Sequence, residues 1–298
     1  MTDNGVFTDN LKKRSYRACI SDAFRSTCRL IRRLTAGNKV FFALFAIAQG
    51  IAGVLTEYVK PGLLYVGFEP HIGALVLLLT VVAVSSLLID CKMWSTVNGR
   101  GIGWNITRLL KTLPVSLCFI AAYLAAAATA AYFYISASKA PQDIPLINLA
   151  GIAATLLPIL MIFTLPLAYV YTRYLVEPGV SMRKTFGRAY GDGFSHWWTI
   201  FLTLLLATIC IFIVEAALCL PYHILSAAND RAAITASVYG DASAMPSDYY
   251  ALVFTASLFG GIVSIGIAMF KTYTLYNIYQ TIRISAGERR TRKADGKR

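Results

Sequence analysis

The stretch "TLPVSLCFIAAYLAAAATAAYFYISAS", residues 112–138, contains no Asp, Glu, Lys or Arg. A helix needs about 20 mostly apolar residues to cross the hydrocarbon core of a bilayer, which is roughly 30 Å thick. The stretch is long enough, and it lacks the alternation of polar and apolar side chains that is typical of a membrane β-barrel strand. It therefore predicts a transmembrane α-helix.

Five further segments share this absence of charged side chains. They are residues 40–56, 70–89, 144–172, 193–214 and 249–270. The first of them is the shortest, and it depends on Lys39 and Tyr58 to mark its two interfaces. Because backbone polar groups in lipid must be satisfied within helices or closed barrels, the sequence predicts an all-α, polytopic membrane protein with six transmembrane helices.

The composition agrees with this fold class. Of the 298 residues 57% are hydrophobic and 14% are charged, whereas a soluble domain carries about 25% charged residues. All but three of the 28 Lys and Arg residues, namely Lys60, Lys139 and Arg231, lie on one side of the predicted spans. The positive-inside rule then places both termini in the cytoplasm and predicts a multi-pass protein of the cell inner membrane. The net charge of +13 follows from this topology, which argues against a nucleic-acid partner.

The chain divides into three predicted regions. They are a cytoplasmic N-terminal region with an amphipathic helix (1–39), a six-helix transmembrane domain (40–282) and a basic disordered tail (283–298). A basic segment precedes the first, third and fifth spans, so we expect three related hairpins. The last outer loop, about residues 221–249, predicts either a flexible cap or a short surface helix.

The first basic segment has the clearest helical pattern. At 100° per residue, one face carries Phe24, Thr27, Cys28, Ile31 and Leu34. Another face carries Arg25, Arg29, Arg32 and Arg33. The third segment places Lys184 and Arg188 opposite apolar side chains in the same way. These bases predict interfacial helices that contact anionic headgroups, and the alternative that they only fix topology stays open.

A resemblance to a known family lies in "YLVEPGVSMRKTFGRAYGDGFSHWWTIFLTLLL", residues 174–206. An acid and Gly after one span, then Ser, a short amphipathic helix and paired tryptophans at the next span, resemble the repeating unit of bacterial six-helix inner-membrane proteins of the YciC type. The membrane domain attached to some glycerophosphodiester phosphodiesterases is similar. The resemblance implies an architecture and transfers no catalytic residue.

Four residues inside the spans are candidates for an intramembrane polar site. Glu215 is the only carboxylate well inside a predicted span, and Gln49 carries an amide near mid-membrane. Pro158 and Pro166 interrupt the fourth span, where broken helices of transporters build binding sites. Each also has a structural reading: Glu215 as an outer-leaflet contact, Gln49 as a link between helices, and the prolines as ordinary kinks.

The motifs of enzymes are absent from the sequence. There is no His-Glu-x-x-His, Gly-x-Ser-x-Gly or Cys-x-x-Cys pattern, so we expect no catalytic residue, metal or cofactor. The leading hypothesis is a non-enzymatic scaffold or envelope factor that contacts anionic lipids, partner proteins or further copies of itself. The alternative is a small-solute or ion transporter that uses Glu215 and the kinked fourth span. A lipid-modifying enzyme comes third.

Overall fold

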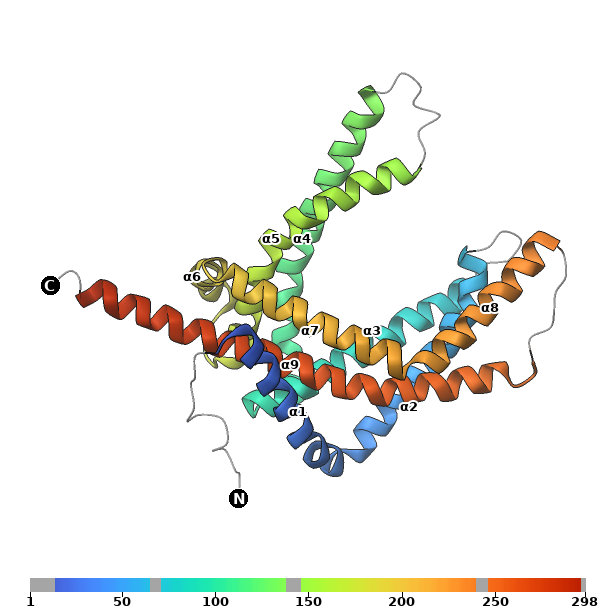
Figure 1. The fold of residues 1–298 in the computed structure, drawn as a ribbon, viewed down its shortest axis with the longest axis horizontal. Helices are drawn as coiled ribbons and strands as arrows, with labels where there is room; N and C mark the ends of the chain where they lie inside the picture. Colours follow the sequence, from blue (N-terminus) through green and yellow to red (C-terminus); the bar gives the residue numbers. More distant parts are fainter. Residues whose placement is uncertain (1–13, 65–70, 138–145, 240–245, 296–298) are drawn as a thin grey trace. The chain divides into compact units, whose positions relative to one another are not determined.

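The computed structural model describes residues 14–64, 71–137, 146–239 and 246–295, without the side chains of residues 32–36, 137, 146–150, 152, 153, 184, 239 and 289–295. Within these residues the chain forms nine helices and no strand (Figure 1). They are α1 (Tyr16–Gly37), α2 (Lys39–Leu64), α3 (Ile72–Asn98), α4 (Ile102–Ala137), α5 (Leu146–Val176), α6 (Met182–Phe194), α7 (Trp197–Leu218), α8 (Leu220–Tyr239) and α9 (Tyr249–Asp295).

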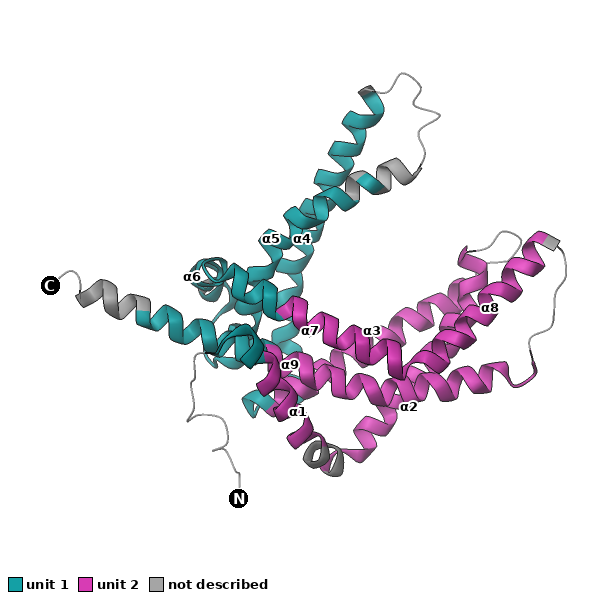
Figure 2. Ribbon diagram, in the orientation of Figure 1, with its two compact units in different colours: residues 1–19, 97–203, 275–298 teal, residues 20–96, 204–274 magenta. Residues whose placement is uncertain are grey.

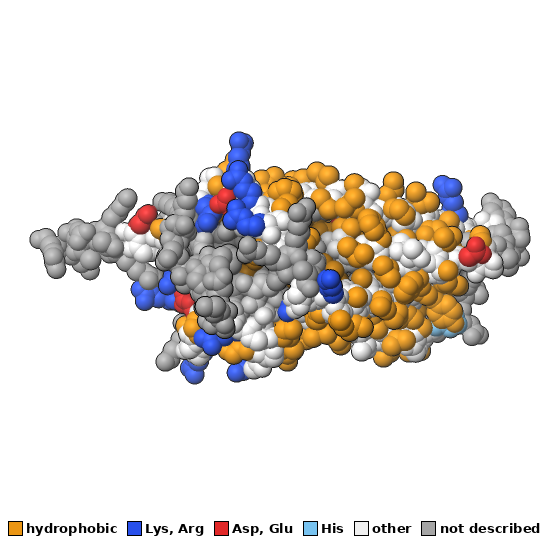
Figure 3. All heavy atoms as spheres, turned by 90° about the horizontal axis from the view of Figure 1, so that it is seen from below, with side chains coloured by type: hydrophobic (Ala, Val, Ile, Leu, Met, Phe, Trp, Pro, Cys, Tyr) orange, Lys and Arg blue, Asp and Glu red, His pale blue; other side chains and the backbone are white. Residues whose placement is uncertain are grey.

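Six of these helices, α2, α3, α4, α5, α7 and α9, are long and apolar enough to cross a membrane. The prediction of an all-α fold with six helices of transmembrane length is confirmed. On the face drawn in Figure 3, hydrophobic side chains cover a broad area in which Lys and Arg are few. Lipid is the solvent in which such an apolar surface is stable.

The chain forms two compact units, which Figure 2 shows in different colours. Unit 1 comprises residues 1–19, 97–203 and 275–298, and unit 2 comprises residues 20–96 and 204–274. Helices α1, α3, α7 and α9 each contribute residues to both units. In unit 1, α5 packs against α4 and α6.

Small residues allow close helix packing in unit 2. A Cβ atom added at Gly261 of α9 would lie 2.8 Å from the Cβ of Gln49 in α2, and one added at Gly50 would lie 2.7 Å from the ring of Phe254. Neither position has room for a larger side chain without movement of its neighbour. This is the packing that small residues provide between membrane helices.

The helices extend beyond the uncharged runs that predict them. Helix α2 continues past Glu57 and Lys60 to Leu64, and the predicted loop of residues 221–249 contains the 20-residue helix α8, which packs against α2. The segment 283–298, predicted to be disordered, is helical as far as Asp295. An existing helix adds further residues at low cost, and this segment is rich in Arg and Lys, which are good helix formers.

Candidate functional site

Gln49 and Glu215 line the same cavity in unit 2. The cavity has a volume of about 310 Å³, and its walls come from α2, α3, α7, α9 and the start of α8. The polar residues of the wall are Gln49, Thr56, Glu215, Tyr222, His223, Ser257 and Ser264. Two candidates from distant parts of the sequence are therefore brought together by the fold.

Three polar groups of this wall are not fully satisfied by the protein. The exposed carboxylate of Glu215 forms no hydrogen bond or ion pair with any residue that the structure describes. Gln49 donates from Nε2 to Ser85 Oγ at 3.1 Å, which leaves its amide oxygen as an acceptor. Ser257 Oγ is buried without a partner among the described residues. Because an unsatisfied buried polar group costs about 1–3 kcal/mol, the wall favours a polar occupant.

The charge of Glu215 affects a neighbouring thiol. Cys219 lies on the same wall, between α7 and α8. Burial raises the pKa of the Cys219 thiol, and the negative charge of Glu215 raises it further. The thiol is therefore held in its neutral, protonated form, and Glu215 is the acidic group of the cavity.

A second acid, Glu57, lies buried beside this cavity and is not among the candidates that the sequence predicts. Its side chain is 1% exposed. It accepts hydrogen bonds from Tyr222 Oη at 3.1 Å, Asn229 Nδ2 at 2.9 Å and Tyr249 Oη at 3.3 Å. All three donors are neutral, and Tyr222 belongs both to this cluster and to the cavity wall. Burial and the carboxylate of Glu57 raise the pKa of Tyr222, which keeps the hydroxyl protonated as a donor.

The backbone of Glu57 takes part in the same cluster. Pro61 lies inside α2 and has no N–H, so the Glu57 carbonyl one turn earlier has no helical partner. Asn229 Nδ2 donates to that carbonyl at 2.9 Å as well as to the carboxylate. One turn along α2, Lys60 forms an ion pair with Asp230 at 2.7 Å.

Glu57 is absent from the predicted candidates because the uncharged run that predicts the first span ends at Thr56. A usable signal was present, because Gly50, Gly53 and Glu57 share one face of a helix at spacings of three and four, and all three are buried. A carboxylate on the small-residue face of a span is positioned to lie between helices.

The two candidate prolines belong to unit 1, so the structure does not group them with Gln49 and Glu215. Pro166 is buried in α5 and leaves the Ile162 carbonyl without a helical partner. The indole Nε1 of Trp197 donates to that carbonyl at 3.1 Å. Pro158 is exposed on the same helix. The carbonyl that Pro166 leaves without a helical partner is therefore satisfied by the protein itself, without a solute.

The basic candidates lie on α1 and α6. Arg25 and Arg29 are exposed on α1, beside Phe24, which is 62% exposed, and Cys28. Among the side chains of α1 that the structure describes, the buried ones are Cys19, Ala23 and Thr27. The predicted apolar face is therefore only partly buried, because α1 packs on its small residues. Arg188 of α6 is exposed, and the side chains of Arg32, Arg33 and Lys184 lie outside the described part of the chain.

Unit 1 holds an acid of its own, Glu177, just beyond the end of α5. Tyr279 Oη donates to its carboxylate at 2.7 Å, and Arg173 Nε forms an ion pair with it at 3.0 Å. Burial alone would raise the pKa of Glu177. The hydrogen bonds from Tyr279 and Arg173 and the charges of Arg173 and Arg283 outweigh burial, so the pKa lies below its ordinary value.

Arg108 caps the same end of α5. Its guanidinium donates to the backbone carbonyls of Tyr174, Glu177 and Val180. It also lies 4.2 Å from the ring centroid of Trp104 and 4.4 Å from that of Tyr174. A cation at a helix C-terminus stabilises the exposed carbonyls and the negative end of the helix dipole.

Within the described residues, no group of three His, Cys, Asp or Glu side chains could hold a metal ion. Comparison with protein-family models, with curated proteins and with solved structures finds no match to this chain. The resemblance to six-helix proteins of the YciC type therefore stays a prediction. The residues themselves identify a protein with six helices of transmembrane length and two acids beside one cavity in unit 2.

Proposed function

We propose that this chain is a multi-pass membrane protein that binds a small cationic solute in the cavity of unit 2 and carries it across the bilayer. The observation that supports the proposal is the unpaired carboxylate of Glu215 on one cavity wall with Gln49 and the unpartnered hydroxyl of Ser257. An ionisable group within a membrane span is a functional candidate because isolation there is costly.

The chemistry of the wall favours a monovalent cation or a protonated amine. Such a ligand can be bound by the carboxylate of Glu215, the amide oxygen of Gln49 and the hydroxyl of Ser257. All three supply oxygen atoms, and one carries a negative charge. The volume of about 310 Å³ lies at the lower end of the range for small-molecule sites, which fits a solute of a few heavy atoms.

The test compares Glu215→Gln with the wild-type protein. In proteoliposomes, uptake of radiolabelled methylammonium should fall about tenfold or more, because the variant keeps the shape of the side chain and removes the charge. The matched control is Asp248→Asn, an exposed acid of unit 2 that does not line the cavity. Uptake by Glu215→Gln equal to that of the wild type would contradict the proposal.

A second candidate function is a non-enzymatic scaffold or envelope factor that lies on anionic lipid through α1. The exposed edge formed by Phe24, Arg25, Cys28 and Arg29 supports it, because an apolar ring beside two bases suits the headgroup region. A fluorophore on Cys28, with the other cysteines replaced, should be less accessible to an aqueous quencher in nanodiscs of phosphatidylglycerol than in phosphatidylcholine. Equal accessibility in both lipids would count against this function.

We also propose that the six helices form three related hairpins in the cell inner membrane, with both termini cytoplasmic. The distribution of Lys and Arg supports this orientation. A membrane-impermeant thiol reagent added to intact cells should modify a cysteine introduced at Ser247. It should leave Cys28 unmodified until the cells are opened. Labelling of Cys28 in intact cells would reverse the orientation.

A further inference from the structure

The solute site proposed for unit 2 leaves one neighbouring acid, Glu57, without a role. Gly53 and Thr56 of α2 line the cavity, and Gly53 lies one helical turn before Glu57 on the same face. A Cβ atom added at Gly53 would lie 3.6 Å from the ring of Tyr222, which also lines the cavity and donates to Glu57. Tyr222 therefore connects the cavity wall with the carboxylate of Glu57.

Glu57 is a buried acid without a counter-ion. No Lys, Arg or His in the part of the chain that the structure describes forms an ion pair with it. Lys60 of α2 and Asp230 of α8 pair with each other at 2.7 Å, so their charges cancel. On α9, the titratable groups within range of Glu57 are the phenols of Tyr249 and Tyr250. A proton would neutralise a negative charge that these groups leave uncompensated within a span.

Burial restricts the cations that can reach this carboxylate. Glu57 is 1% exposed, so a metal ion or an ammonium group has no access to it. A carboxylate offers about four lone-pair sites. Tyr222 occupies one on Oε1, and Asn229 and Tyr249 occupy two on Oε2. The site that remains lies on Oε1, the oxygen that Tyr222 contacts, and a proton is small enough to occupy it.

Tyr222 supplies a path for that proton. Its hydroxyl donates to Glu57 Oε1 at 3.1 Å, and its oxygen accepts no hydrogen bond from any residue that the structure describes. A hydronium ion in the cavity can give a proton to this oxygen. The original O–H bond of Tyr222 then breaks as an O–H bond forms on Glu57, and Tyr222 stays neutral. The Glu57 hydroxyl now donates to Tyr222, so the hydrogen bond is kept with its direction reversed.

The charge of Glu57 also acts on the solute site. A cation in the cavity is attracted by the carboxylate of Glu215 on the wall and by that of Glu57 behind Tyr222. Electrostatic attraction is stronger in the protein interior than in water. A proton on Glu57 removes one of the two negative charges and weakens the binding of the cation. The proton and the cation therefore compete although they bind different groups.

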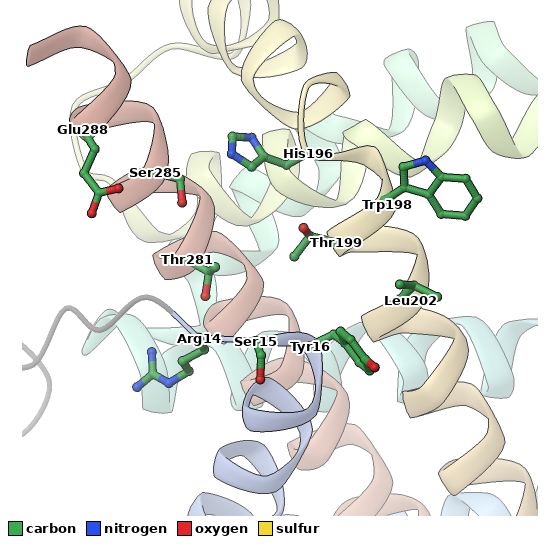
Figure 4. Close-up of a pocket in the computed structure, with 10 residues that line it drawn as sticks. All are labelled: Arg14, Ser15, Tyr16, His196, Trp198, Thr199, Leu202, Thr281, Ser285 and Glu288. Carbon is green, nitrogen blue, oxygen red and sulfur yellow. The ribbon is translucent and has the colours of Figure 1, made fainter. Parts of the chain in front are cut away.

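The cavity of unit 1 differs in this respect. Its volume is about 410 Å³, and its walls come from the start of α1, the first turns of α7 and the C-terminal part of α9 (Figure 4). The charged side chains of its wall, Arg14 and Glu288, both interact with other groups. Acids without a counter-ion beside a cavity are thus a feature of unit 2.

We propose that Glu57 is the proton-binding residue of this carrier, and that a proton bound there through Tyr222 releases the cation from the cavity. The protein then exchanges one monovalent cation for one proton. The inference rests on the proposed function, because it assigns the ion that is exchanged for the solute.

The test is calorimetric titration of the full-length protein in detergent with methylammonium, in two buffers of different ionisation enthalpy, which counts the protons released. Between pH 5 and pH 8, the wild type should release up to about one proton more per bound methylammonium than Glu57→Gln. Protonation of Glu215 contributes to both proteins and cancels in the difference. Equal proton release by the wild type and Glu57→Gln at every pH would overturn the proposal.

The same titration separates this inference from the function on which it rests. Binding of methylammonium by the wild type, weakened about tenfold in Glu215→Gln, supports the solute site whatever the proton count. If the wild type does not bind methylammonium, or Glu215→Gln binds it as tightly, both the solute site and the proton site are overturned.

Tyr222→Phe tests the path of the proton and keeps the test decisive if Glu57→Gln does not fold. A pH-indicator dye in a stopped-flow experiment follows proton release after mixing with saturating methylammonium. Tyr222→Phe should slow this release about tenfold or more, because the hydroxyl that passes the proton is removed. The matched control is Tyr250→Phe, the same change on an exposed ring that forms no hydrogen bond with Glu57, and it should alter the rate by less than about twofold. Equal rates in the two variants would overturn the proposal.

Discussion

Both units contain a proline whose missing N–H is compensated by a side chain from another helix. In unit 2, Pro61 cannot donate to the Glu57 carbonyl, and Asn229 donates to it instead. In unit 1, Pro166 cannot donate to the Ile162 carbonyl, and Trp197 donates to it instead. The same backbone defect is thus used twice to join helices, through an amide in one unit and an indole in the other.

The two hydrogen bonds differ in the surroundings of the carbonyl that accepts them. In unit 2 the carbonyl belongs to Glu57, which is itself a buried acid. Asn229 donates hydrogen bonds to this carbonyl and to the Glu57 carboxylate. In unit 1 the acid Glu177 is partly exposed, does not own the carbonyl that Pro166 leaves without a helical partner, and has arginine partners. A cluster that concentrates three neutral donors on one carboxylate should be the more sensitive of the two to substitution.

The largest effect is expected for Glu57→Ala. It removes the acceptor of Tyr222, Asn229 and Tyr249 and leaves their donors unsatisfied next to a new cavity. We expect a loss of about 3–5 kcal/mol in the free energy of unfolding, measured in detergent. The control Arg231→Ala, at an exposed position of α8 in the same unit, should change it by less than about 0.5 kcal/mol. A loss as small as the control would show that the cluster does not hold unit 2 together.

Asn229→Ala should have the next largest effect, about 2 kcal/mol, because it removes hydrogen bonds to both the carbonyl and the carboxylate of Glu57. Pro61→Ala restores an N–H for the carbonyl. In that background Asn229→Ala should cost about 1 kcal/mol less, as measured by a double-mutant cycle. An identical cost of Asn229→Ala in both backgrounds would mean that the stabilisation by Asn229 does not depend on the N–H that Pro61 lacks.

Glu177→Gln tests the acid of unit 1, where we expect a loss of about 1–2 kcal/mol at pH 7. The folded protein has a lowered pKa at Glu177. Its contribution to stability is therefore present above the ordinary glutamate pKa, about 4.3, and is lost as the pH falls through the lower folded value. The difference between wild type and variant should shrink in unfolding measurements at pH 3. If wild type and Glu177→Gln differ in stability by the same amount at pH 7 and pH 3, the charge of Glu177 is not the source of its contribution.

The smallest effect is expected for Trp197→Phe. The variant keeps an aromatic ring for stacking on Phe201, whose ring centroid lies 5.0 Å from that of Trp197, and loses the N–H that binds Ile162 together with part of the ring volume. We expect a loss of about 1 kcal/mol, which Pro166→Ala should reduce. If Trp197→Phe costs more than Asn229→Ala, the comparison between the two units is reversed.

The sequence predicted the helices better than it predicted the site. Uncharged runs located all six helices of transmembrane length, because a charged side chain is costly in lipid and is therefore rare within a span. Glu215 and Gln49 were found as polar residues inside such runs. Glu57 is not predicted as a site residue because it follows directly after an uncharged run. The roles of Arg108 and Glu177 are not predicted because their partners are backbone and side-chain groups far along the chain.

The sequence by itself determined the fold class, since the hydrocarbon core requires about 20 apolar residues for each crossing and a helix satisfies its backbone locally. Only the tertiary structure decided which polar groups meet. Gln49 lines one cavity with Glu215, and Glu57 lies against α8 and α9, because the small residues Gly50, Gly53 and Gly261 allow close packing in unit 2. Helical period specifies the face on which a side chain lies, and packing between helices specifies its partner.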